Sequence, residues 1–339
     1  MSLAVALAGC GYFSQFHQDA WSRIEDVTVV AIADRDRSKA EAAARHFPTA
    51  RVFSDAEEMI ASASPDLIDI ATPPATHLAL VKAAARARVP VICQKPLAPD
   101  WEGAQAIVEI AEHSNIPLIV HENFRFMPWF WEAKRLAQAR ELGSLLNITF
   151  RLRPGDGQGP DAYLSRQPYF QQMPRFLIHE TGVHLIDVFR FIVGEIRGVF
   201  SRLKRYNPVI VGEDAGLVVF EFEGGALGLF DGNRHVDHPA HDTRMTNGVM
   251  FLEGTRGALR LDGFGRLFLK PLGGLEREHH YHWENRGFGG DCVFQQMQHA
   301  VDHLLRGAAL MNSGRDYLRN LAIEEAIYQS NDQERFIAV

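Results

Sequence analysis

Lys95 ends an apolar stretch that suits a buried strand, and a lysine at that place could act on a bound ligand. The stretch is Val89-Pro90-Val91-Ile92-Cys93-Gln94-Lys95-Pro96. Its apolar part, residues 89–93, is typical of a parallel sheet, and open α/β sheets bind ligands at the carboxyl ends of their strands. Pro96 favours an extended backbone at Lys95. The alternative is a solvated lysine on a loop.

A second stretch, His179-Glu180-Thr181-Gly182-Val183-His184-Leu185-Ile186-Asp187, combines an imidazole with carboxylates. It is predicted to be a helix that ends near Gly194. Glu180 and His184 are four residues apart and Asp187 is three further on, so all three can project from one helical face. A carboxylate beside an imidazole fixes its tautomer and suits it to act as a general base. The alternative is an ion pair on a helix surface.

The elements that must position these residues begin with a dinucleotide fingerprint. The apolar run Leu3–Ala8 leads into Gly9-Cys10-Gly11-Tyr12-Phe13-Ser14, and a helical pattern follows through Ile24. The first glycine permits a tight turn, the second lets the backbone approach a pyrophosphate, and the helix start offers N–H groups. Ser14 replaces the third glycine and can donate to a phosphate. A plain strand–turn–helix is the alternative.

Asp34 ends the next predicted strand, Val27–Ala33, twenty residues beyond Ser14. A carboxylate there would accept hydrogen bonds from the adenosine ribose and repel a 2′-phosphate. Arg35 could stack on adenine or tolerate that phosphate. The sequence therefore predicts NAD as cofactor, with NADP possible.

Strands and helices continue to alternate up to residue 121, with Thr72-Pro73-Pro74-Ala75-Thr76-His77 as a rigid turn that starts a helix. Further strands are predicted at residues 51–53, 67–70 and 117–121. Six strands with intervening helices predict an α/β fold, a Rossmann doubly wound parallel sheet. The predicted division is a dinucleotide-binding domain over residues 1–122 and a substrate-binding and oligomerisation domain over residues 123–339.

The predicted second domain is α+β, with a large open, mainly antiparallel sheet. After Gly194 the residues mostly alternate between apolar and polar, with glycine turns. One sheet face is left without helices, which predicts a homodimer or homotetramer. The long segment from Arg153 to Tyr169 is predicted to be a flap over the substrate.

The motifs together resemble the Gfo/Idh/MocA family of NAD(P)-dependent sugar and polyol dehydrogenases. The resemblance rests on Gly9-x-Gly11, Thr72-Pro73 with His77, Lys95-Pro96, and Glu180-Thr181-Gly182-x-His184-x-x-Asp187, and it covers nearly the whole chain. The family usually has Glu-Lys-Pro where this chain has Gln94-Lys95-Pro96, and Asp where this chain has Glu180. Gln-Lys-Pro with Glu-Thr-Gly-x-His is similar to dehydrogenases for branched pentoses such as D-apiose.

The resemblance implies that the protein moves a hydride from a sugar or polyol CH–OH group, such as the anomeric carbon of an aldose, to NAD. His184 would take the hydroxyl proton, Lys95 would hold that oxygen, and Glu180 would hold a neighbouring hydroxyl. Two other functions of the same fold stay open: a glycosidase that uses transient oxidation by NAD, and a non-catalytic dinucleotide-binding regulator. The predicted substrate residues are Lys95, Arg125, Glu180 and His184. The predicted cofactor residues are Gly9, Gly11, Tyr12, Phe13, Ser14, Asp34, Arg35, Thr72, Pro73, His77, Gln94 and Lys95.

Composition argues against several other classes. A net charge of -7 without a basic block argues against nucleic acid as a partner. No apolar run approaches the roughly 18 residues of a membrane helix, and Leu3–Ala8 is predicted to be a strand rather than a signal peptide. Cys10, Cys93 and Cys292 predict free thiols in a reducing cytoplasm. No metal is predicted, since the histidines at 235–241 and 279–282 lack zinc-ligand spacing and cysteine partners.

Overall fold

The computed structural model describes residues 2–339 and divides the chain into two compact units. The first contains residues up to Asn123 together with Asp291–Arg319, and the second contains Phe124–Gly290 and Asn320–Val339. The boundary predicted at 122/123 lies within one residue of the first break. The prediction assigned residues 291–319 to the second domain, whereas their contacts place them in the first unit.

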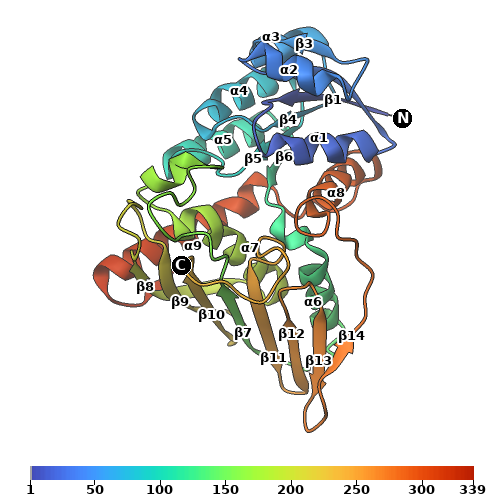
Figure 1. Ribbon diagram of the computed structural model, residues 1–339. Helices are drawn as coiled ribbons and strands as arrows, with labels where there is room; N and C mark the ends of the chain where they lie inside the picture. The colour runs from blue at the N-terminus through green and yellow to red at the C-terminus, as the bar shows by residue number, and fades with distance from the viewer. Residues whose placement is uncertain (1) are drawn as a thin grey trace. The chain divides into compact units, whose positions relative to one another are not determined.

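A six-stranded parallel sheet forms the centre of the first unit (Figure 1). Its strand order is β3-β2-β1-β4-β5-β6. Strands β1 to β3 are added toward one edge of the sheet and β4 to β6 toward the other, so the order switches between β1 and β4. The strands are β1 Leu3–Ala8, β2 Val27–Ala33, β3 Arg51–Phe53, β4 Leu67–Ile70, β5 Val91–Gln94 and β6 Leu118–His121. They are nearly continuous apolar runs because helices cover both faces, and the predicted Rossmann fold is confirmed.

The helices of the first unit form two layers. Helices α3, α4 and α5 pack consecutively, and α1 packs against α8. An ion pair between Arg23 and Asp291, at 2.5 Å, ties α1 to the start of α8, which explains why residues 291–319 belong to this unit. The helices are α1 Ser14–Arg23, α2 Arg37–Ala44, α3 Ala56–Ala63, the 3₁₀ turn Pro74–Thr76, α4 His77–Ala87, α5 Trp101–His113 and α8 Cys292–Arg306.

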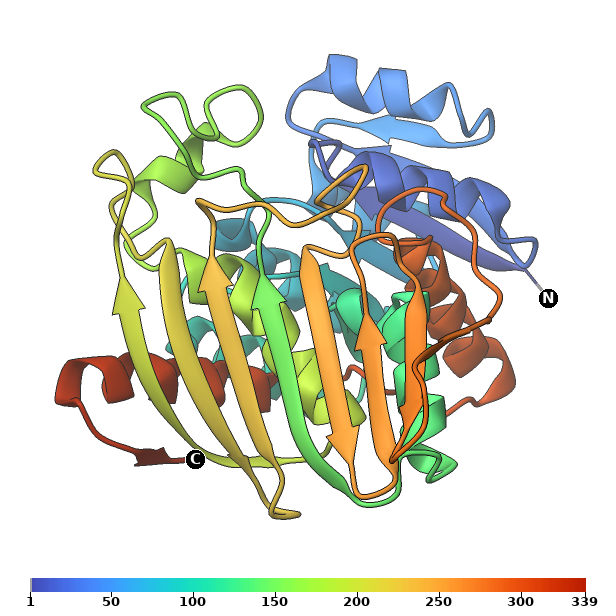
Figure 2. The same cartoon turned by 60° about the horizontal axis from the view of Figure 1, so that its bottom comes forward.

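A nine-stranded sheet dominates the second unit (Figure 2). Its order is β14-β13-β12-β11-β7-β10-β9-β8-β15, and among the described residues β7 with β10 is the one parallel pair of this second sheet. The predicted open, mainly antiparallel sheet is therefore confirmed. The strands are β7 Leu145–Leu152, β8 Ile196–Lys204, β9 Ala215–Phe222, β10 Leu227–Asn233, β11 Gly248–Gly254, β12 Gly257–Leu261, β13 Leu267–Pro271, β14 Arg277–His279 and β15 Ile337–Ala338.

Helices cover one face of this sheet, and the other face is turned toward the viewer in Figure 2. They are the 3₁₀ turn Phe124–Phe126, α6 Pro128–Gln138, α7 Val183–Ile192 and α9 Gly314–Gln333, which begins in the first unit. Alternate side chains such as Phe150, Phe220 and Phe230 are buried on the covered face. Leu217 and Val219, on the open face, are 50% and 39% exposed.

Two segments lead into α7 in the second unit. Residues 153–176 contain the predicted flap and the 3₁₀ turn Pro168–Gln172, and Leu177–Gly182 is a π-helix that continues directly into α7. The uniform helix predicted over 179–187 is therefore a π-turn followed by an α-helix. A π-turn is wider than an α-turn, and such turns often occur at functional sites.

Candidate active site

The glycine turn after β1 fits a dinucleotide pyrophosphate. Gly9 has φ +98°, and a Cβ there would lie 2.7 Å from the carbonyl oxygen of Ala71, so only glycine is accommodated. A Cβ at Gly11 would meet nothing within 4 Å, which leaves open space beside the backbone. Helix α1 begins at Ser14, whose hydroxyl donates to the carbonyl of Gly11 at 2.7 Å. The turn therefore directs the N-terminus of α1 at open space, as anion binding requires.

Asp34 stabilises this turn from the end of β2. Its Oδ2 accepts the backbone N–H of Cys10 at 2.7 Å, and its Oδ1 accepts the N–H of Asp36 at 2.8 Å. Burial and the neighbouring Asp34 raise the pKa of the Cys10 thiol to about 12, so the turn carries no thiolate that would repel phosphate. Arg35 is exposed beside this carboxylate, and Tyr12 is 51% exposed. These positions fit an adenosine ribose near Asp34.

His77 connects the turns that follow β4 and β5. Its Nε2 lies 2.8 Å from the carbonyl oxygen of Thr72, and its Nδ1 lies 3.0 Å from that of Leu97. Burial lowers the pKa of His77 even though both carbonyls favour the charged ring. A neutral ring donates to one carbonyl at a time. The imidazole is fully buried, and its contacts hold the Thr72-Pro73 turn next to the segment that follows Lys95.

Gln94 links the backbone of Lys95 to two buried imidazoles. Its Oε1 accepts the Lys95 N–H at 2.7 Å, while its Nε2 lies 3.2 Å from His17 Nε2 and 3.4 Å from His121 Nδ1. The two rings stack with centroids 4.2 Å apart. The other nitrogen of His17, Nδ1, lies 2.9 Å from the buried carboxylate of Asp69. That carboxylate makes Nδ1 the donor, so Nε2 of a neutral His17 accepts from the Gln94 amide.

Lys95 lies in the cis Lys95–Pro96 turn at the carboxyl end of β5, the edge at which Gly9 follows β1. Its side chain is half-buried. Gly9, Thr72 and Lys95 all follow parallel strands and therefore lie along one edge of the sheet. The first unit thus brings the predicted cofactor residues to that edge.

In the second unit, Glu213 starts the π-helix that carries Glu180. Its carboxylate accepts the backbone N–H groups of Phe176 and Ile178, at 3.2 and 3.0 Å, and the hydroxyl of Tyr328 at 2.6 Å. A carboxylate at this end satisfies N–H groups that have no partner within the helix and complements its dipole. Glu213 therefore determines where the helix begins.

Glu180 lies in this π-helix beside Arg234. Its Oε2 accepts from Arg234 Nη2 at 2.8 Å and from the Thr181 hydroxyl at 2.5 Å. His184, one turn further on, is buried and stacks on Phe124, with centroids 4.1 Å apart and planes 6° from parallel. The face of the imidazole is thus held by an aromatic ring.

Asp187 pairs with the predicted substrate residue Arg125. Arg125 Nε and Nη2 donate to the two carboxylate oxygens at 2.7 and 2.5 Å, and both residues are buried. Asn320 also donates to Asp187 at 2.8 Å. Removing one partner of a buried pair leaves the other charge uncompensated and costs about 3–5 kcal/mol, so Arg125 and Asp187 depend on each other. Substrate binding by Arg125 stays a prediction.

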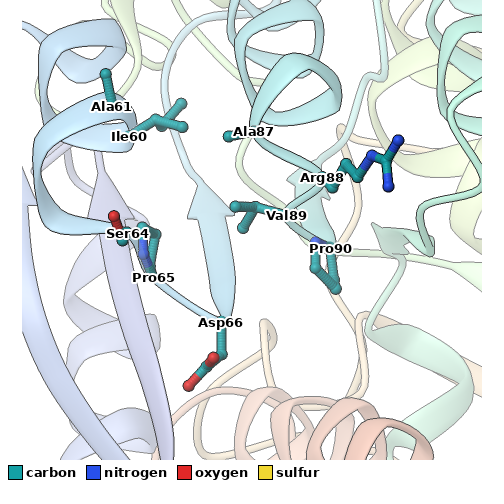
Figure 3. A pocket seen from close by; sticks show the side chains of 9 residues that line it. All are labelled: Ile60, Ala61, Ser64, Pro65, Asp66, Ala87, Arg88, Val89 and Pro90. Carbon is teal, nitrogen blue, oxygen red and sulfur yellow. The ribbon is translucent and has the colours of Figure 1, made fainter.

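Two hollows on the surface lie at the opposite edge of the Rossmann sheet. One is lined by residues such as Ser64, Asp66 and Pro90, which precede β4 and β5 (Figure 3). It contains none of the predicted site residues. Across residues 2–339, no group of three or more His, Cys, Asp and Glu side chains is arranged to hold a metal ion.

Sequence reasoning did not identify His17, Asp69, His121 and Arg234. The first three come from α1, β4 and β6, so their spacing in the chain contains no motif. An aspartate within the apolar strand Leu67–Ile70 was the available signal, because a buried carboxylate requires donors. Arg234 follows β10 with no motif around it.

The two units together define a class, an NAD-binding oxidoreductase with a Rossmann unit and an α+β unit. Residues 3–122 match the model of the oxidoreductase family with an NAD-binding Rossmann fold, and residues 130–260 match the Gfo/Idh/MocA C-terminal domain. The chain belongs to the Gfo/Idh/MocA family.

Named relatives cover almost the whole chain. D-apiose dehydrogenase of Rhizobium rhizogenes (strain K84) is 32% identical over 343 residues, covering 98% of this chain and 96% of that protein. D-apiose dehydrogenase of Paraburkholderia graminis is 31% identical over 340 residues, covering 98% and 88%. A solved oxidoreductase from Agrobacterium radiobacter, in complex with NAD+, L-tartaric acid and magnesium, has a TM-score of 0.89, 32% identity and coverage of 100% and 98%.

The protein is therefore an NAD-binding oxidoreductase of the sugar-dehydrogenase type. The predicted family, fold class, enzyme class and NAD cofactor are confirmed.

Proposed function

We propose that the protein oxidises a hydroxyl group of a neutral sugar, with D-apiose as the first candidate and the anomeric carbon as the oxidised position. The observation that supports this most is the full-length similarity to two D-apiose dehydrogenases. The dinucleotide turn and the Lys95 turn at one edge of the Rossmann sheet fit the same chemistry. Oxidation of an aldose at its anomeric carbon would yield a lactone.

In this proposal each predicted residue has one role. When NAD is bound, it supplies the hydride acceptor. Lys95 donates to the reacting oxygen and stabilises its developing negative charge. His184 accepts the hydroxyl proton as a general base, and Glu180 accepts a hydrogen bond from a neighbouring hydroxyl.

A screen of aldoses, polyols and glycosides with NAD tests the function. We expect NADH absorbance to appear with D-apiose at a higher kcat/KM than with inositol or common hexoses. Net reduction with none of the sugars, together with hydrolysis of a glycoside, would replace the proposal by the glycosidase alternative. NAD binding without either reaction would favour the regulator.

We also propose that the protein forms a homodimer or homotetramer through the open face of the nine-stranded sheet. This face exposes Leu217, Val219, Leu227 and Phe251 on strands β9, β10 and β11, with β7 between β10 and β11. A stable interface buries about 1,200–2,000 Å² and has an apolar centre. Light scattering should give a multiple of 38.0 kDa, and Val219→Glu should lower that mass. A wild-type monomer at all concentrations would contradict the proposal.

We further propose a reducing cytoplasm as its location. Cys10, Cys93 and Cys292 are free thiols, as predicted, and the last two are buried. Among the described residues, no helix is both long and apolar enough to cross a membrane. Detection of the protein in a fractionated cell extract tests the location, and recovery with the membrane or periplasmic fraction would contradict it.

A further inference from the structure

Arg234 is a buried cation between the flap and Glu180, within the second unit. Its side chain is 4% exposed, and Nη2 donates to Glu180 Oε2 at 2.8 Å and to the Thr181 hydroxyl at 2.5 Å. Nη1 donates to both oxygens of Asp156 in the flap, at 3.2 and 3.1 Å. One guanidinium therefore bridges the carboxylate predicted to bind a sugar hydroxyl and a carboxylate of the flap.

The flap is built around this cation rather than being an open loop. Residues 162, 163, 170, 176 and 210 form a small hydrophobic core of their own. The guanidinium carbon lies 4.5 Å from the ring centroid of Phe176, 5.6 Å from Tyr163 and 5.9 Å from Phe170. Aromatic faces attract a cation that has lost its water.

Backbone contacts add a second connection between Arg234 and the flap. Its carbonyl accepts the N–H of Gly157 at 2.9 Å, and a Cβ at Gly157 would lie 2.9 Å from the Cβ of Arg234. Asn207 donates to the carbonyls of Gly157 and Gly159, each at 2.8 Å. These hydrogen bonds fix the glycine-rich part of the flap beside the backbone of Arg234.

The charge of Arg234 depends on the carboxylates of Glu180 and Asp156, and these carboxylates depend on Arg234. Burial disfavours the charged guanidinium, but Asp156, Tyr163 and Glu180 outweigh burial and raise the pKa of Arg234 above its ordinary value. Its Nε is buried without a hydrogen-bond partner, so the ion contacts at Nη1 and Nη2 carry the compensation. Loss of the cation would leave Glu180 and Asp156 without their shared counter-ion.

We propose that Arg234 is a positioning residue that determines sugar selectivity, because it holds the Glu180 carboxylate in one orientation and couples that orientation to the flap. The inference rests on the proposed function of Glu180 as the acceptor of a sugar hydroxyl. Recognition of that hydroxyl then depends on the flap, through Asp156 and Arg234.

The first test compares Arg234→Lys with Arg153→Lys in the full-length protein at saturating NAD. Arg153 lies at the base of the same flap and pairs with Asp231 at 2.6 Å, so it is a matched control. For the sugar that is oxidised fastest, Arg234→Lys should lower kcat/KM on the order of 10²-fold, the usual cost of a misplacement of about 1 Å. Its preference for that sugar over the deoxy analogues should shrink about tenfold, since 1.4 kcal/mol of lost recognition is tenfold. Arg153→Lys should keep the wild-type preference.

A double-mutant cycle with Glu180→Gln separates positioning from general damage. If Arg234 acts through Glu180, the double variant should have nearly the kcat/KM of Glu180→Gln alone. Additive losses would overturn the proposal. NADH titration by fluorescence should give the same affinity in all four proteins, which shows that the Rossmann unit is intact.

Tryptic cleavage measures the coupling between Glu180 and the flap without an activity assay. Arg166 lies in the flap and is half-buried, while the bond after Arg153 is resistant because Pro154 follows. Cleavage after Arg166 should be several-fold faster in Arg234→Lys and in Glu180→Gln than in Arg153→Lys, since local opening controls it. Unchanged cleavage in Glu180→Gln would overturn the coupling. A wild type without sugar oxidation would refute the proposed function, while this assay would still decide whether Glu180 and the flap are coupled.

Discussion

The groups that hold Lys95 and Glu180 differ in kind: an amide contacts the backbone of Lys95 in the first unit, and an arginine contacts the carboxylate of Glu180 in the second. The Gln94 amide and the imidazoles of His17 and His121 hold the Lys95 backbone, with Asp69 behind them. Arg234, Asp156 and Thr181 hold Glu180.

The difference has a physical consequence. An amide holds its partners by the direction of its hydrogen bonds, whereas an arginine also holds them by its charge. We therefore expect the backbone of Lys95 to respond to the exchange of a single amide, and Glu180 to respond mainly to the removal of a charge.

Replacing Lys95 is the strongest test of the first region. Lys95→Met removes a donor and a positive charge from the developing alkoxide, so turnover should fall at least on the order of 10²–10⁴-fold. NAD affinity should fall only modestly, because the Gly9–Ser14 turn is untouched. Cofactor titration and turnover should be measured on the same preparation. Near-normal turnover would remove Lys95 from the chemistry.

Replacing His184 should have an effect of similar or slightly smaller size. His184→Asn keeps a polar group of similar size but not the base, so kcat/KM should fall on the order of 10²–10⁴-fold. The kcat/KM of the wild type and of the variant should be measured with the same sugar at saturating NAD. A loss of less than about tenfold would assign the base to another group.

The Rossmann half of the comparison was largely predictable from the sequence. Strands that are buried on both faces are continuous apolar runs, which are easy to delimit in a sequence. The bounds predicted for β1, β2 and β4 therefore agree with the structure. Asp55 and Asp100 stand directly before α3 and α5 and cap these helices, since each accepts a backbone N–H of the first turn, from Glu58 and Gly103. These features depend on neighbours in sequence.

The polar surroundings of the two sites were not predictable in the same way. His17 and His121 lie about one hundred residues apart and meet only because α1 and β6 belong to one sheet-and-helix unit. The α-helical spacing of Glu180, His184 and Asp187 predicted one shared face, yet the π-turn changes the angle between the first two. Tertiary contacts from Glu213 and Arg234 select that turn, and they have no local signal.

The choice between NAD and NADP tests whether the charge of Asp34 outweighs that of Arg35 at this edge of the first unit. We expect kcat/KM for NAD to exceed that for NADP about tenfold or more, which corresponds to at least about 1.4 kcal/mol of repulsion of the 2′-phosphate. Asp34→Asn keeps an acceptor for the Cys10 N–H but loses the charge, so it should narrow the preference. Equal wild-type values would mean that Arg35 outweighs Asp34.

The smallest effect is expected from Gln94→Glu, and it tests whether the Gln94 amide holds the Lys95 backbone through its two imidazole partners. The introduced carboxylate keeps an acceptor for the Lys95 N–H but loses the amide nitrogen that lies 3.2 Å from His17 Nε2 and 3.4 Å from His121 Nδ1. Because His17 directs Nδ1 at Asp69, a neutral His17 would turn an acceptor nitrogen toward the carboxylate. The loss in kcat/KM should stay within about tenfold, or 1.4 kcal/mol. Gln94→Asn, which is shorter but keeps the amide, is the control for lost reach. If Gln94→Glu matches the wild type, the amide of residue 94 does not matter to Lys95, and the contrast between the two regions reduces to a difference in packing.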